Sequence, residues 1–83
     1  MSESARVPVQ MPKWGLTAED ATIVEWMIGE GDEVREGDVL LTVETDKATG
    51  EVEAPASGTL ARVLAPEGRT VRPGEVLAEI ERS

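Results

Sequence analysis

The chain has 83 residues, a net charge of −9, and neither cysteine nor histidine. A chain of this length forms one small domain with a modest core. Without cysteine it has no thiolate nucleophile, disulfide or zinc–thiolate site, and without histidine it lacks the commonest general base and metal ligand. The acidic balance argues against nucleic acid as a partner, because phosphate binding needs clustered Lys and Arg, and it favours partners with basic surfaces.

The N-terminal residues 1–6 contain no apolar run, so we interpret them as a flexible tail rather than a signal peptide. They are also too short and too acidic for an Arg-rich transit peptide. No segment approaches the roughly 18 apolar residues of a membrane span. We therefore expect no membrane partner and a location in the bacterial cytoplasm, with the mitochondrial matrix as the alternative.

Short aliphatic runs bounded by glycine or proline follow one another along the chain, which is typical of an all-β domain. In chain order, strands are expected at residues 7–9, 23–27, 39–43, 50–53, 59–64 and 76–80. No stretch of helical length carries apolar residues at the i, i+3, i+4 spacing. Six glycines that separate these runs are expected at positive φ, where glycine has no Cβ penalty: Gly29, Gly31, Gly37, Gly58, Gly68 and Gly74.

The sequence contains an internal repeat, in which residues 22–44 match residues 59–81 without a gap. Gly31 and Gly37 are followed 37 positions later by Gly68 and Gly74. Two copies are too few for a solenoid, so the repeat predicts two small packed antiparallel sheets with approximate two-fold symmetry. The same offset predicts that the segment after Glu44 lies at one end of the domain and both chain termini at the other.

Lys47 is the candidate functional residue. Only two lysines stand against seventeen acidic residues, and Lys47 lies between two expected strands in Glu44-Thr45-Asp46-Lys47-Ala48-Thr49. The residues themselves predict an exposed lysine in a hairpin turn, in which Asp46 is a suitable opening residue that can bond backbone N–H groups. The other lysine, Lys13, lies outside the turn and is interpreted as a loop charge.

Two other features have structural interpretations. Trp26 lies in an expected strand and is predicted to pack either in the core or half-buried. The carboxylates of Glu44, Glu51 and Glu53 lie in strands around the turn and fit a solvated face better than a catalytic pair.

The chain resembles the lipoyl domains of 2-oxo acid dehydrogenase acyltransferases from about residue 7 to residue 80. The landmarks are Met11-Pro12-Lys13-Trp14-Gly15-Leu16-Thr17, Gly31-Asp32-Glu33-Val34-Arg35-Glu36-Gly37-Asp38, Glu44-Thr45-Asp46-Lys47-Ala48-Thr49, Ala54-Pro55-Ala56-Ser57-Gly58 and Glu67-Gly68-Arg69-Thr70-Val71. The resemblance implies a flattened barrel of two four-stranded sheets, a barrel-sandwich hybrid. The domain would span residues 7–81, with residues 82–83 as its end or the start of a linker.

The same resemblance implies that Lys47 carries lipoate in amide linkage, attached by a lipoate ligase or lipoyl transferase. The implied partners are a thiamine-diphosphate-dependent 2-oxo acid decarboxylase, the acyltransferase core and dihydrolipoyl dehydrogenase. The domain is not itself an enzyme on this view, and in isolation it is expected to be a monomer. Residues beside the lysine and in a neighbouring loop would take part in partner recognition: Glu44, Thr45, Asp46, Ala48, Gly15, Leu16, Thr17, Glu19 and Asp20. Turn formation and a solvated acidic loop are equally compatible roles for them.

Two alternative functions stay open. Biotinyl carrier domains share the fold but normally place methionine on both sides of the lysine, where this chain has Asp46 and Ala48. An unmodified interaction module of the same fold is the other. The lysine context differs from that of the glycine-cleavage carrier, and no export signal supports a periplasmic adaptor. The sequence of residues 12–17 resembles that of pyruvate- and acetoin-type acyltransferases more than that of 2-oxoglutarate ones.

Overall fold

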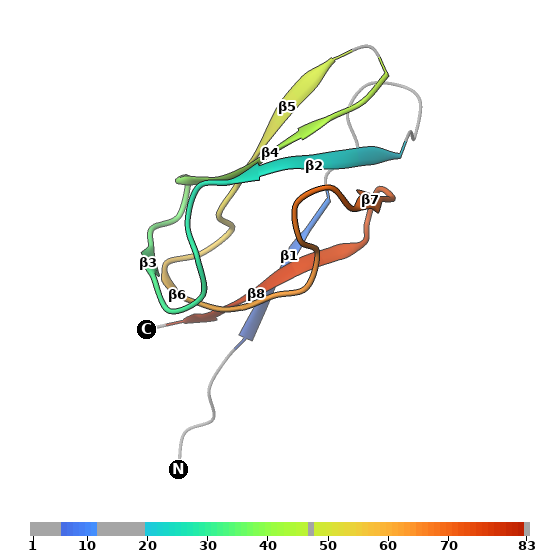
Figure 1. Cartoon of the computed structure of the whole chain (residues 1–83). Coiled ribbons are helices and arrows are strands. Elements are labelled where there is room, and N and C mark those ends of the chain that lie inside the picture. Colours follow the sequence, from blue (N-terminus) through green and yellow to red (C-terminus); the bar gives the residue numbers. More distant parts are fainter. Residues whose placement is uncertain (1–5, 12–19, 47, 83) are drawn as a thin grey trace.

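In the computed structural model, two four-stranded antiparallel sheets face each other around an aliphatic core (Figure 1). The structure describes residues 6–11, 20–46 and 48–82. One sheet has the order β1 (Arg6–Gln10), β8 (Val76–Arg82), β6 (Gly58–Val63), β3 (Glu33–Val34). The other has the order β5 (Thr49–Glu53), β4 (Val39–Glu44), β2 (Ala21–Trp26), β7 (Thr70–Val71). The predicted all-β fold of two four-stranded sheets is confirmed.

The internal repeat of the sequence is a two-fold symmetry of the structure. Exchanging β1 with β5, β8 with β4, β6 with β2 and β3 with β7 converts one sheet order into the other. Hydrogen bonds repeat in the same way. The Gly31 N–H donates to the Leu60 carbonyl at 2.8 Å, and the Gly68 N–H donates to the Ile23 carbonyl at 2.8 Å. Both bonds join the first half to the second, so each half closes the other.

Six of the eight strands match the sequence prediction, with ends that differ by at most two residues. The two others, β3 and β7, were not predicted because each has only two residues, too few to display an alternating apolar pattern. They occupy equivalent places in the repeat. β3 pairs with β6 at the edge of one sheet, and β7 pairs with β2 at the edge of the other.

The glycine prediction holds for most of the positions. Four glycines in two equivalent pairs have φ between 86° and 93°: Gly31, Gly37, Gly68 and Gly74. Gly58 has a φ of 159°, close to extended backbone, and is needed for another reason: a Cβ there would meet the backbone carbonyl oxygen of Glu81 on β8. The prediction is wrong for Gly29, which is not among the glycines with positive φ.

The core is aliphatic and occurs in equivalent pairs. Fully buried side chains that correspond in the repeat are Ile23 and Leu60, Leu40 and Leu77, Val43 and Ile80. No polar or charged side chain is buried among the described residues. Trp26 is half-buried, as predicted, and its Nε1–H donates to the Ala65 carbonyl at 2.8 Å. Burial of apolar area therefore supplies most of the stability.

The turn that connects β4 to β5 and the described ends of the chain lie at opposite ends of the molecule (Figure 1). Arg6 pairs with Glu81, so the ends of β1 and β8 lie side by side. Lys47 itself lies outside the described residues. Nothing among the described segments is a helix long and apolar enough to cross a membrane.

Candidate functional site

The candidate site is the turn between β4 and β5. The two strands remain paired to their ends, where Glu44 lies opposite Thr49. Thr45 then closes the turn on Ala48. The Thr45 N–H donates to the Ala48 carbonyl at 2.7 Å, and the Thr45 hydroxyl donates to the same carbonyl at 3.1 Å. The chain between them is held at both ends, and Asp46 and Ala48, the neighbours of Lys47, are exposed.

In the described part of the turn, the side-chain hydrogen bonds come from Thr45. The Thr45 Oγ1 also accepts a hydrogen bond from the Ala48 N–H at 3.2 Å, so one hydroxyl serves two backbone groups. In the described part of the turn, no such bond comes from Asp46. A hydroxyl can donate and accept at once, whereas a carboxylate only accepts. The sequence prediction gave Thr45 a recognition role and missed this closing contact, although threonine next to a turn is a known signal for it.

A hollow of about 420 Å³ lies beside the turn. Five of the described residues line it: Asp20, Thr22, Glu44, Thr45 and Asp46. The structure thus brings Asp20, which precedes β2, together with three predicted recognition residues from the end of β4. The other members of the predicted loop, Gly15, Leu16, Thr17 and Glu19, lie outside the described residues.

Thr22 is a lining residue that the sequence analysis did not select. It reaches the hollow because β2 pairs with β4, which sets Thr22 opposite Glu44. Its hydroxyl lies 3.4 Å from that of Thr70. The sequence around Thr22 does not indicate that it lies beside the turn, because this position results from the pairing of β2 with β4.

The hollow is acidic. Three of its lining side chains are carboxylates, and Asp20, Glu44 and Asp46 are all exposed. Glu51 and Glu53 on the neighbouring strand β5 are exposed too, which confirms the predicted solvated face. Opposite charges on a partner would be attracted, with a range of about 10 Å at moderate salt. Within the described residues, no three His, Cys, Asp or Glu side chains are grouped so as to hold a metal ion.

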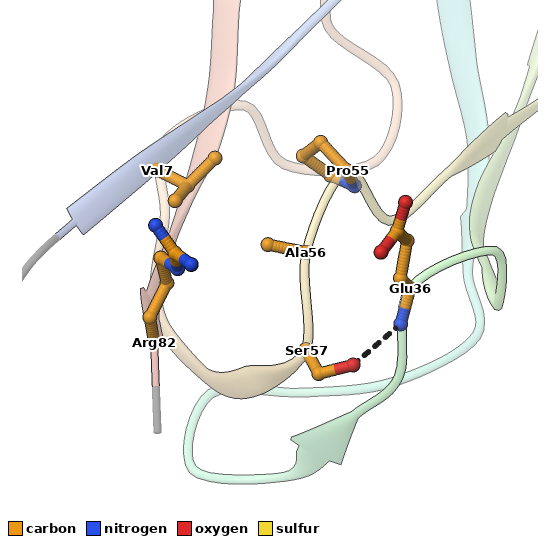
Figure 2. Close-up of a pocket in the computed structure, with 6 residues that line it drawn as sticks. All are labelled: Val7, Glu36, Pro55, Ala56, Ser57 and Arg82. Atoms are coloured by element: carbon orange, nitrogen blue, oxygen red, sulfur yellow. Dashed lines mark hydrogen bonds between the residues drawn. The ribbon is translucent and has the colours of Figure 1, made fainter.

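A second hollow, of about 450 Å³, lies beside Val7 of β1 and Arg82 of β8 (Figure 2). Arg82 of β8 and Glu36 of the segment after β3 lie on opposite walls, and Ala56 lies between them. The Glu36 N–H donates to the Ser57 hydroxyl at 2.9 Å, which fixes one wall. The described residues that line it offer neither a nucleophile paired with a base nor a group of metal ligands, so the turn after β4 is the better candidate.

The model of one protein family, described as "Biotin-requiring enzyme", matches residues 7–80. The chain belongs to this biotin/lipoyl attachment family. It is therefore a carrier domain of the biotinyl/lipoyl type, and its fold and turn agree with that membership. The resemblance to the lipoyl domains of 2-oxo acid dehydrogenase acyltransferases, inferred from sequence landmarks, is confirmed by the individual relatives.

Curated relatives are acyltransferases of three kinds of complex. The chain is 46% identical over 70 residues to the dihydrolipoyllysine-residue acetyltransferase component of the acetoin cleaving system of Pseudomonas putida, covering 84% of this chain and 19% of that protein. It is 44% identical over 62 residues to the acetyltransferase component of the pyruvate dehydrogenase complex of Rhizobium meliloti, covering 75% of this chain and 14% of that protein. It is 40% identical over 75 residues to the succinyltransferase component of the 2-oxoglutarate dehydrogenase complex of Rickettsia conorii, covering 90% of this chain and 19% of that protein. The chain thus spans less than a fifth of the length of these relatives.

Two solved structures show the same fold. The lipoyl domain of the 2-oxoglutarate dehydrogenase complex from Azotobacter vinelandii superposes with a TM-score of 0.74 at 30% identity, covering 93% of this chain and 98% of that one. A single-chain, multi-domain long-chain acyl-CoA carboxylase superposes with a TM-score of 0.77 at 26% identity, covering 94% of this chain and 7% of that one. The biotin/lipoyl attachment fold is therefore shared with proteins of two different chemistries.

Proposed function

We propose that this domain is the lipoyl carrier of a 2-oxo acid dehydrogenase-type acyltransferase, with lipoate attached to the Nζ of Lys47 through an amide bond. The observation that carries the proposal is the Asp46-Lys47-Ala48 triplet in the turn between β4 and β5 of a biotin/lipoyl attachment domain. The only other lysine of the chain, Lys13, precedes β2 and has no such context.

The described neighbours of Lys47 fit a covalently attached arm. Asp46 and Ala48 are exposed, so an attaching enzyme can approach the residue between them. Thr45 closes the turn with two hydrogen bonds to the Ala48 carbonyl. A rigid turn presents its outer residues at a constant position, which lowers the entropy that a partner must remove on binding.

Lipoate, when bound, supplies a dithiolane that exchanges acyl groups and electrons, which this chain cannot do alone because it has no cysteine. The chain's own contribution is to bind and present the group. Amide formation removes the positive charge of the lysine and leaves the carboxylates of Asp20, Glu44 and Asp46 around the turn. The modified end is then more acidic than the unmodified one and is suited to basic partner surfaces.

The proposed partners are a lipoate ligase or lipoyl transferase, a thiamine-diphosphate-dependent 2-oxo acid decarboxylase, the acyltransferase core and dihydrolipoyl dehydrogenase. A tethered carrier visits these sites at high effective concentration, because encounter becomes intramolecular. An acetoin or pyruvate system is favoured over a 2-oxoglutarate one. The support is the identity of 46% and 47% to two acetoin relatives and of 44% to one pyruvate relative; two other pyruvate relatives are 40% identical, as is a 2-oxoglutarate relative.

The test is the intact mass of the chain after expression with lipoate ligase and biotin ligase, in medium that contains both vitamins. We expect a lipoyl increment on the wild type and on Lys13→Arg, the matched control, and none on Lys47→Arg. A biotinyl increment would assign the domain to the biotin carriers. An unmodified wild-type chain would favour the interaction module and overturn the proposal.

A further inference from the structure

Two large apolar side chains, one on β2 and one just after it, are exposed. Among the described residues, the large hydrophobic side chains that are exposed are Val24 at 47% and Met27, just after β2, at 46%. Their equivalents in the second half are Ala61 and Leu64, which are both partly buried. The backbone hydrogen bonds are the same in both halves: Met27 N–H donates to the Leu40 carbonyl and Leu64 N–H to the Leu77 carbonyl, each at 2.8 Å. The fold therefore does not require exposed apolar side chains there.

In the second half, a guanidinium covers the position that corresponds to Met27. The Arg69 Nη1–H donates to the Leu64 carbonyl at 3.1 Å, and its Nη2–H donates to Glu75 Oε2 at 2.7 Å. The other oxygen of Glu75, Oε1, accepts a hydrogen bond from the Arg72 N–H at 3.0 Å. Glu75 thus uses one carboxylate oxygen for its turn and the other for the guanidinium.

In the first half, the acceptors are repeated but the donor is not. Asp38 corresponds to Glu75, and its Oδ2 accepts the equivalent turn bond from the Arg35 N–H at 3.0 Å. Asp32 corresponds to Arg69, and its Oδ2 accepts a hydrogen bond from the Gly29 N–H at 2.8 Å. A carboxylate has no N–H with which to reach the Met27 carbonyl. The ion pairs among the described residues are Arg6–Glu79 and Arg69–Glu75, and neither involves Asp32 or Asp38.

We propose that this surface, the β2 face, formed by Val24, Glu25, Met27, Asp32 and Asp38, is a docking surface for a partner protein that presents an arginine beside an apolar side chain. The apolar side chain packs on Val24 and Met27. The guanidinium lies between the Met27 carbonyl and the Asp38 carboxylate, as Arg69 lies between the Leu64 carbonyl and Glu75.

Charge complementarity selects this occupant. The β2 face has three carboxylates, and the whole chain has a net charge of −9, so an acidic partner or an anionic surface is repelled. An arginine fits better than a lysine, because its planar fork can donate to a carbonyl and a carboxylate at once. Aromatic and arginine side chains are also the ones enriched at protein interfaces, whereas isolated lysines are depleted.

The β2 face does not include Lys47 or its turn. The proposal can therefore be tested on the unmodified chain, and it can fail while the carrier function holds, or the reverse.

The test is a titration of the ¹⁵N-labelled, unmodified chain, followed by NMR, with the peptide acetyl-leucyl-arginyl-leucine amide. The matched peptide has citrulline, which is neutral and has the same shape, in place of arginine. We expect amide shifts at Val24, Met27 and residues 32–38, and much weaker shifts with the citrulline peptide. Asp38→Asn should weaken binding roughly two- to fivefold, the size of one exposed ion pair. Glu53→Gln, which removes one exposed carboxylate from β5, should leave it unchanged.

Asp32→Arg gives a stricter check, because it restores in the first half the donor that Arg69 provides in the second. This variant should fold, as judged by its spectrum, and should lose the peptide response; Asp38→Asn keeps the proposal testable if it does not fold. Equal binding of the two peptides, or shifts confined to the β4–β5 turn, would overturn the proposal. Shifts at Val24 and Met27 that follow chain concentration without peptide would mean that a second copy is the occupant, and would overturn it too.

Discussion

At the scale of single residues, Thr45 decides how the candidate acceptor is presented. Its hydroxyl and its N–H both bond to Ala48, so the side chain and the backbone close the same turn. The flanking carboxylates of Glu44 and Asp46 give the turn its negative charge, whereas the hydrogen bonds of Thr45 fix its backbone shape.

Substitutions of Thr45 test the contribution of its hydroxyl to the turn. Thr45→Ala removes the hydroxyl contacts to the Ala48 N–H and carbonyl. The free energy of unfolding should therefore fall by about 1 kcal/mol. The initial rate of lipoylation should also fall. Thr45→Ser keeps the hydroxyl and should behave like the wild type. The labelling rate with purified lipoate ligase and a urea unfolding curve measure the two effects. Equal rates for Ala and Ser would show that the hydroxyl has no part in presentation.

At Gly58 the fold has no room for a side chain. A Cβ at Gly58 would meet the carbonyl group of Glu81 and the Cα of Arg82 on β8, which cannot move without separating β6 from β8. Gly58→Ala should therefore cost about 3 kcal/mol or more, or prevent folding. Gly29→Ala is the matched control, since its Cβ would be 3.9 Å from Asp32 Oδ2 and its φ is not positive. It should change stability by less than about 0.5 kcal/mol. Similar costs for the two variants in urea unfolding would contradict this account.

At the scale of elements, each half of the repeat provides a glutamate that bonds the backbone of a strand in the other half. The ladder between β2 and β4 is irregular between Ile23 and Glu25, and the ladder between β6 and β8 is irregular between Leu60 and Arg62. Just beyond each irregularity a glutamate from the opposite half accepts a backbone bond. Glu67 Oε2 accepts from the Trp26 N–H at 3.0 Å, and Glu30 Oε2 accepts from the Val63 N–H at 2.8 Å. A β-bulge leaves a backbone group without its ladder partner, and these side chains replace that partner.

The two glutamates should contribute equally. Glu30→Ala and Glu67→Ala should each lower the free energy of unfolding by about 1 kcal/mol, since each removes one exposed charge-assisted bond. Their glutamine variants retain an acceptor oxygen and should lose less. Urea unfolding of the four variants measures this. A large cost for one alanine variant and none for its equivalent would mean that the two-fold symmetry does not extend to energetics.

Sequence reasoning reached most of the elements and only part of the site. The aliphatic runs and the repeat with its paired glycines predicted six strands and their symmetry. β3 and β7 were not predicted because a strand of two residues is too short to show an alternating apolar pattern. The prediction for Gly29 was wrong because a glycine beside a turn need not adopt positive φ. At the site, Asp20 and Glu44 were selected from resemblance, whereas Thr22 depends on pairing across β2 and β4 that no local pattern encodes.

At the scale of the whole molecule, the turn that holds the proposed acceptor and the described chain ends lie far apart. The turn after β4 lies at one end, and the described ends at Arg6 and Arg82 lie at the other (Figure 1). The core between them is continuous and contains no buried polar group among the described residues. A rigid spacer of this kind suits a carrier that is held at one end and visited at the other.

Fusions test this arrangement. A folded domain joined before residue 1 or after residue 83 should leave the initial rate of lipoylation unchanged, because either fusion adds bulk at the end opposite the turn. The same domain inserted between Asp46 and Ala48 with a lysine retained should abolish labelling. Rates measured with purified lipoate ligase decide the matter. Slower labelling of either terminal fusion would place the acceptor elsewhere.

The most direct measurement of the central claim is tandem mass spectrometry of the protein isolated from the cells that produce it. Fragment ions across residues 44–49 identify both the modified residue and the group that it carries. The account predicts a lipoyl increment on Lys47 and an unmodified Lys13. A lipoyl group on Lys13, a biotinyl group on Lys47, or an unmodified Lys47 in lipoate-replete cells would contradict it.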